Sequence, residues 1–158
     1  MQLPICCGTG EPLPTFQYVE SFACGDLLAY TSNQPRSEYF VVESDLQEVQ
    51  IELGSMRVFE IASAGKDLNV HVDVYDGYAF PYCSDVVTGG KPTVWRATSG
   101  TVSITRSTVP ASDGFVTPSM YRVVIKATNL FFEGPAGRKL RAAGPITISG
   151  KGGWSPYG

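Results

Sequence analysis

The sequence predicts an all-β protein: a single β-sandwich, Ig-like or jelly-roll-like, of about eight to ten strands. Three observations support this fold class. The 158 residues are enough for one domain with a hydrophobic core. The chain has 43% hydrophobic and only 17% charged residues, with 17 Gly and 11 Pro between its apolar runs. Those runs alternate with a period of two, which is typical of half-buried strands separated by turns.

The alternation is clearest in residues 68–75. Val70, Val72 and Val74 are predicted to face the core with Leu68, while His71 and Asp73 are predicted to face outward, exposed, with Asn69 and Tyr75. Residues 47–53 and 101–105 alternate in the same way, and 120–132 is long enough for a bent or bulged strand. Weaker strand candidates are residues 16–22, 27–30, 38–42, 57–61, 94–97 and 146–149. Residues 43–48 favour at most one helical turn.

Residues 1–15 contain Pro4, Pro12 and Pro14 and two glycines, so we expect an extended N-terminal arm before a sandwich domain at residues 16–158. An extended arm can add to the sheet edge of a neighbouring copy. No apolar run approaches the ~20 residues of a membrane-spanning helix. The first ten residues lack the pattern of a signal peptide, so Met1 is either native or replaces one.

The four cysteines predict a disulfide rather than a zinc site, because they form no CxxC pair and the chain has one histidine. We expect Cys24 and Cys83 to be bonded, since adjacent Cys6 and Cys7 bond to each other only with strain. The pairing of Cys6 and Cys7 stays open. The alternative is that all four are thiols in a reducing compartment.

Charge is unevenly distributed along the chain, although its net value is only −3. Residues 1–90 hold 13 acidic and 3 basic residues, and residues 91–158 hold 2 acidic and 9 basic ones. Interleaved strands could mix these charges on one surface. Alternatively, a basic face of one subunit meets an acidic face of another, because opposed potentials favour association.

The sequence predicts no enzyme. His71 lies in the middle of a predicted strand, and no nucleophile-elbow glycine pattern occurs, so a Ser-His-Asp or Cys-His site has no support. Asp73, Asp76 and Asp85 are close enough in sequence for the paired carboxylates of a glycosidase, but acids near a strand end are more often solvated or bonded to turn backbone.

The same three carboxylates, Asp73, Asp76 and Asp85, could hold calcium, which prefers oxygen ligands, and no other cofactor is expected. Aromatic residues beside acids also suit a carbohydrate site, because rings stack on sugar faces while carboxylates accept hydroxyl hydrogen bonds. In the alternative interpretation, these rings cap one end of the core. The candidate ligand-binding residues are Tyr75, Asp76, Tyr78, Tyr82 and Asp85.

Residues 95–133 begin with Trp-Arg-Ala-Thr-Ser-Gly-Thr-Val-Ser-Ile-Thr and end with Tyr-Arg-Val-Val-Ile-Lys-Ala-Thr-Asn-Leu-Phe-Phe-Glu. This stretch resembles uncharacterised β-rich domains of bacterial secreted proteins and lipoproteins. The resemblance implies export and no particular activity. Residues 3–6, Leu-Pro-Ile-Cys, depart from a lipobox, which has small residues in place of Pro and Ile.

These observations together predict a non-catalytic, exposed structural or adhesive subunit that assembles with copies of itself or with other proteins. We expect an extracellular or cell-surface location, with a filament or a virus-like shell as possible settings. The alternative function is a carbohydrate- or calcium-binding module. Nucleic acid is not an expected partner, because Arg138, Lys139 and Arg141 form a basic cluster without interleaved aromatic residues.

Overall fold

The computed structural model describes residues 12–154 and places nine strands in that range, which confirms the all-β prediction. Short helical turns lie between some of the strands. In chain order the elements are β1 (Glu20–Cys24), β2 (Leu28–Ser32), β3 (Glu38–Glu43), α1 (Leu46–Val49), β4 (Met56–Glu60), α2 (Ile61–Ala64), η2 (Gly65–Asp67), β5 (Asn69–Val74), β6 (Thr93–Ser107), η3 (Ala111–Asp113), β7 (Tyr121–Glu133), η4 (Pro135–Gly137), β8 (Lys139–Arg141) and β9 (Ile146–Gly152).

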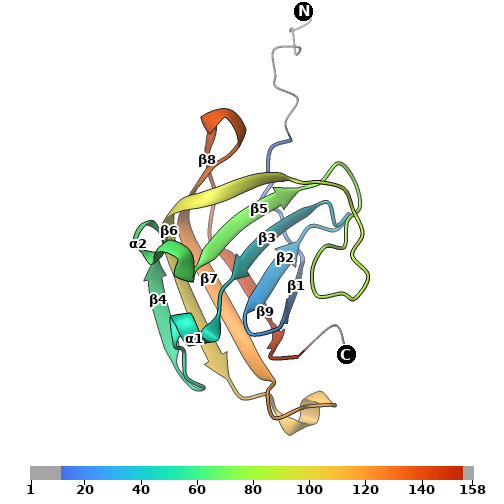
Figure 1. Cartoon of the computed structure of the whole chain (residues 1–158), viewed down its shortest axis with the longest axis vertical. Helices are drawn as coiled ribbons and strands as arrows, with labels where there is room; N and C mark the ends of the chain where they lie inside the picture. The colour runs from blue at the N-terminus through green and yellow to red at the C-terminus, as the bar shows by residue number, and fades with distance from the viewer. Residues whose placement is uncertain (1–11, 155–158) are drawn as a thin grey trace, which may run out of the picture.

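All strand pairs are antiparallel. The sheet has two halves, and the two longest strands, β6 and β7, run through both (Figure 1). The start of β6 pairs with β5, which continues through β3 and β2 to β1. The end of β6 pairs with β4, and the start of β7 pairs with β9. Each half buries side chains in one common core, so the fold is sandwich-like.

A bend in β6 and β7 allows one strand pair to serve both halves. The β6–β7 register shifts twice between Ala97 and Thr101. Gly100 lies in this bulge with φ 133°, and a Cβ there would be 2.9 Å from the backbone oxygens of Thr128 and Asn129. Asn129, on the partner strand, also has a positive φ of 52°. Only glycine fits such a backbone at so close an approach, and bulges increase the local twist of a sheet.

The last strand returns to the first. The Gly25 N–H donates to the Trp154 carbonyl at 2.8 Å, and the Gly153 N–H donates to the Gly25 carbonyl at 2.7 Å. Within β9, a Cβ at Gly150 would lie 3.0 Å from the Ala23 nitrogen, so glycine permits the close approach of β9 to β1. The curved sheet is therefore nearly closed along this edge.

The main core is apolar and lies inside the curved sheet. Its largest aromatic side chains are Trp95, Tyr121, Phe40 and Phe132, and each is at most 1% exposed. The predicted inward residues of the 68–75 strand, Leu68, Val70, Val72 and Val74, all belong to this core, so that part of the alternation is confirmed.

The other face of the same strands is also buried. Residues 75–92 fold over β2, β3 and β5 and cover their outer face, which we call the covered face. It carries Tyr30, Tyr39, Val41, His71 and Asp73, and Tyr75 and Tyr82 of the loop pack onto it. The Cys24–Cys83 disulfide, with a Cα–Cα distance of 5.7 Å, joins this loop to the end of β1 as predicted. The prediction that His71, Asp73 and Tyr75 are exposed is wrong, since their exposed fractions are only 6%, 2% and 8%.

Residues 47–53 were predicted as a strand, and this prediction is also wrong. The Asp45 side chain accepts a hydrogen bond from the Gln47 N–H and starts the single helical turn α1, which ends at Gln50 in a left-handed conformation. Val49 and Ile51 are buried, whereas Leu53 is 51% exposed. Alternation cannot separate a short strand from one capped helical turn when both bury two apolar residues.

Among residues 12–154, no helix is both long and apolar enough to cross a membrane. Residues 12–15, the described end of the predicted arm, contact their own chain. The Thr15 N–H and hydroxyl donate to Glu38 Oε1 at 2.8 and 3.0 Å, and the Trp95 indole donates to the Pro12 carbonyl at 3.3 Å. Glu38 is 2% exposed and also accepts from Phe16 and Tyr18, so four donors compensate its buried carboxylate.

Candidate functional site

The predicted ligand-binding residues do not gather on one surface. Tyr75 is 8% exposed, and the Tyr82 ring lies 5.9 Å from the Tyr39 ring, so both pack onto the covered face. Tyr78 is 64% exposed, and Asp76 and Asp85 are exposed in the same loop. The arrangement of Tyr75 and Tyr82 corresponds to the alternative interpretation, in which the rings cap a core.

A polar network lies inside the covered face. Asp73 Oδ1 is 2.6 Å from His71 Nδ1, and Asp73 Oδ2 accepts a hydrogen bond from the Tyr82 hydroxyl. Both carboxylate oxygens therefore have partners, as a buried charge requires. His71 Nε2 points toward Glu43, whose Oε1 is 3.7 Å away and accepts a hydrogen bond from Asn69 at 2.8 Å.

The tyrosines of the covered face are held in the neutral form. Burial raises the pKa of Tyr75 to about 12, and the nearby Asp73 carboxylate adds to the shift. Burial also raises the pKa of Tyr82, together with its hydrogen bond to Asp73. Since neutral phenols donate hydrogen bonds, Tyr82 remains a donor to Asp73 throughout the physiological pH range.

Asp73, Asp76 and Asp85, the predicted calcium ligands, are not brought together. In the described part of the chain, no three His, Cys, Asp or Glu residues form a group arranged to hold a metal ion. Asp73 is committed to His71 and Tyr82, while Asp76 and Asp85 face solvent.

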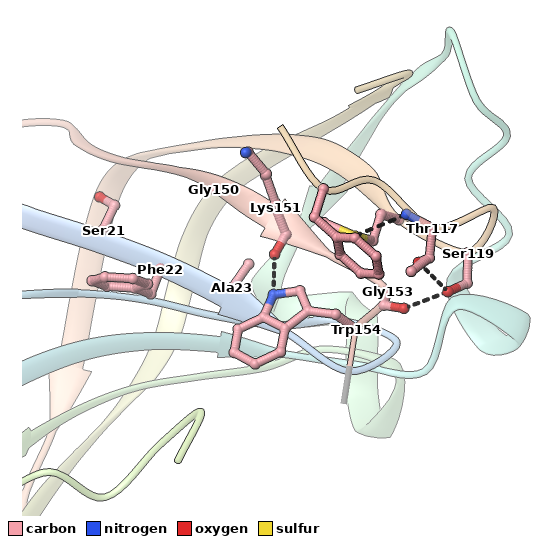
Figure 2. A pocket seen from close by; sticks show the side chains of 11 residues that line it. Ser21, Phe22, Ala23, Thr117, Ser119, Gly150, Lys151, Gly153 and Trp154 are labelled. Atoms are coloured by element: carbon pink, nitrogen blue, oxygen red, sulfur yellow. Dashed lines mark hydrogen bonds between the residues drawn. The ribbon is translucent and has the colours of Figure 1, made fainter. Parts of the chain in front are cut away.

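A concave site that sequence reasoning missed is a groove beside β1 and β9. It has a volume of about 860 Å³ and is mostly apolar. Three segments that are distant in sequence form it, so no local pattern could indicate it (Figure 2). We call it the apolar groove; its lining residues are Ser21, Phe22 and Ala23 of β1, Phe115, Thr117, Ser119 and Met120 of the loop before β7, and Gly150, Lys151, Gly153 and Trp154 at the end of the chain.

Hydrogen bonds hold the walls of the apolar groove. The Trp154 indole donates to the Lys151 carbonyl at 2.7 Å, and the Ser119 hydroxyl donates to the Gly153 carbonyl at 2.8 Å (Figure 2). The Thr117 N–H donates to the Met120 sulfur at 3.3 Å. These bonds set the positions of the groove walls without using the apolar surfaces that face it.

Aromatic side chains at the apolar groove are unusually exposed. Phe115 is 84% exposed, the highest value among the large apolar side chains of residues 12–154, and Phe22 is 45% exposed. Contiguous exposed apolar surface in a folded protein commonly marks a binding or assembly site. The apolar groove is therefore the best candidate for a functional surface.

The ion pairs between described residues each lie within one half of the sequence. Ion pairs between arginine or lysine and an acid join Arg36 to Glu20 in the acidic half, and Arg122 and Lys151 to Asp113 in the basic half. None of the ion pairs between described residues links the two halves.

Comparison of the chain with protein-family models, with curated proteins and with solved structures yields no match.

Proposed function

We propose that the protein is a non-catalytic, exposed structural subunit that assembles with copies of itself through the apolar groove. The observation that carries this proposal is Phe115, an 84% exposed aromatic side chain that lines a groove of about 860 Å³. Aromatic side chains that fill a pocket on a partner dominate the energy of many protein interfaces.

A second copy is the occupant that this geometry favours. A two-fold interface requires one patch to complement itself, so that residue i contacts j and j contacts i. Phe115 and the groove belong to the same patch, so the Phe115 ring of each copy can enter the groove of the other. The uneven distribution of charge along the sequence supports association as well, because opposed potentials orient approaching copies.

The Cys24–Cys83 disulfide supports an exported location for this subunit, since disulfides persist in oxidising compartments. An extracellular or cell-surface setting, implied by the resemblance to bacterial secreted domains, is part of the same proposal.

Analytical ultracentrifugation of the full chain over a wide concentration range tests the proposal. We expect a monomer–dimer equilibrium whose dissociation constant rises at least tenfold in Phe115→Ser, because loss of an interface hot spot costs about 2–4 kcal/mol. Tyr78→Ser is the matched control, since Tyr78 is 64% exposed but lies in the loop of residues 75–92. A wild-type chain that is monomeric at every concentration contradicts the proposal.

One observation favours a carbohydrate-binding function as the second candidate. The rings of Phe115 and Trp154 share the apolar groove with the hydroxyls of Ser21, Thr117 and Ser119. Rings beside hydroxyl groups suit the apolar and polar faces of a sugar. Binding on a glycan array that is lost in Trp154→Ala, in a chain that stays monomeric, would select this function over self-assembly.

A further inference from the structure

We propose that His71 and Glu43 together bind a divalent transition-metal ion of the Zn²⁺ class, through His71 Nε2 and Glu43 Oε1. This site is separate from the apolar groove and does not depend on the proposed function.

The first argument is the orientation of the imidazole. Asp73 is 2% exposed, lies 2.6 Å from His71 Nδ1 and is itself held by the Tyr82 hydroxyl. This contact favours the tautomer whose proton is on Nδ1, which leaves the lone pair on Nε2. A buried carboxylate that orients a histidine in this way is the usual outer-shell partner of a metal-binding imidazole.

The second argument is the distance from His71 to Glu43. Nε2 and Oε1 are 3.7 Å apart, which is too long for a charge-assisted hydrogen bond of about 2.7–2.9 Å. With Nδ1 protonated, a neutral imidazole also presents its Nε2 lone pair to a negative oxygen. Two ligands about 2.1 Å from one zinc ion, at an angle of about 110–125°, are separated by about 3.4–3.7 Å. A zinc ion between these atoms would therefore match their separation and offset the repulsion between the Nε2 lone pair and the negative oxygen.

The third argument is access and support at Glu43. The Glu43 side chain is 43% exposed and lines a second groove of about 420 Å³, whose other charged lining residues are Asp26, Asp45 and Lys66. Asn69 donates to Glu43 Oε1 at 2.8 Å and orients it. An ion can therefore reach Glu43 from solvent, and water would complete its coordination. Imidazole nitrogen with carboxylate oxygen suits zinc better than calcium, which prefers oxygen ligands alone.

The register of the sheet creates this pair. His71 pairs with Val41, and Glu43 lies two residues further along β3, on the same face. Diagonal neighbours on adjacent strands are about 7–8 Å apart at Cα, which a histidine and a glutamate can bridge.

NMR of the imidazole nitrogens in the full chain tests this inference directly, because His71 is the single histidine and its signals need no assignment. On titration with ZnCl₂ we expect the Nε2 resonance to shift saturably while the Nδ1 proton remains. An Nε2 signal unchanged by millimolar ZnCl₂ would overturn the proposal. So would an Nε2 proton that zinc does not displace, since the contact with Glu43 is then an ion pair.

Zinc affinity by calorimetry should be measured in a chain carrying Cys6→Ser and Cys7→Ser, which removes competing thiols. We expect Glu43→Gln to weaken binding at least tenfold and Asp73→Asn to weaken it 10- to 100-fold. Asp76→Asn is the control and should bind as the parent does, because Asp76 is an exposed acid of the covering loop. Glu43 is partly exposed, so its variant keeps the fold; parental affinity in that variant would sink the assignment.

Discussion

The main core and the covered face are built in different ways, although β2, β3 and β5 contribute to both. The main core is a continuous apolar cluster between the two halves of the sheet. The covered face buries two tyrosines, a histidine and an aspartate under a loop with almost no regular structure, which packs Tyr75 and Tyr82 against them and is fastened by one disulfide. The first region depends on apolar burial, which is non-directional, and the second on a few directional contacts.

This difference shows that apolar side chains are enough to bury one face of a strand, whereas burying the other face requires specific hydrogen-bond and ring contacts. Each polar group on the covered face needs its donor or acceptor once water is excluded. Single substitutions should therefore act on the two regions through different mechanisms.

The largest effect is expected in the main core. Trp95 is fully buried, so Trp95→Ala should lower the free energy of unfolding by about 3–5 kcal/mol through the cavity it leaves. Urea denaturation followed by circular dichroism measures the loss. Phe131→Ala is the control, since Phe131 is 43% exposed, and its loss should be much smaller. Equal losses in the two variants would mean that apolar burial does not dominate this region.

Removing the disulfide should have the next largest effect. Cys24→Ser with Cys83→Ser should cost about 2–4 kcal/mol, because the bond closes a loop across 59 residues of sequence separation. Hydrogen exchange should show residues 75–92 losing protection first, while β6 and β7 stay protected. Uniform loss of protection would show instead that the two regions unfold as one unit. Peptide mapping of the oxidised parent checks the pairing itself.

The polar network should contribute less than the disulfide. Tyr82→Phe removes one hydroxyl and leaves Asp73 Oδ2 without its hydrogen bond, so we expect a loss of about 1–3 kcal/mol. Chemical denaturation of the parent and the variant at neutral pH measures it. A loss near zero would mean that water replaces the hydroxyl and that the covering loop admits solvent.

The smallest effect is expected at the exposed tip of the same loop. Tyr78→Ser should change the free energy of unfolding by less than about 0.5 kcal/mol, since its side chain is 64% exposed. The same variant examines the predicted ligand platform at Tyr78, Asp76 and Asp85. If the parent binds a glycan or calcium and Tyr78→Ser does not, the loop has a ligand-binding role after all.

Much of the fold could be predicted from local pattern. The long strand at residues 120–132 corresponds to β7, and the alternation of residues 68–75 identified the four side chains that enter the core. The errors have physical causes. Residues 47–53 contain two buried apolar residues that a capped helical turn accommodates as well as a strand, and His71 and Asp73 alternate as exposed residues do.

The candidate sites show more clearly what local sequence pattern does not predict. The aromatic loop was visible in the sequence, but the direction in which its rings turn depends on Tyr30 and Tyr39, which lie on other strands. The apolar groove joins β1, the loop before β7 and the residues around Trp154. No spacing rule connects such segments, because their proximity is created by the return of β9 to β1.

By itself, the sequence determined the strand content, the inward side of the best strands and the Cys24–Cys83 pair, since these depend on period-two burial and on which cysteines can be bridged. Only the tertiary structure decided that residues 75–92 cover β5, that His71 meets both Asp73 and Glu43, and that a groove opens beside β9. The physical reason is that alternation specifies two faces of a strand but not what covers each face. That depends on where the connecting loops pack and on the bend at Gly100.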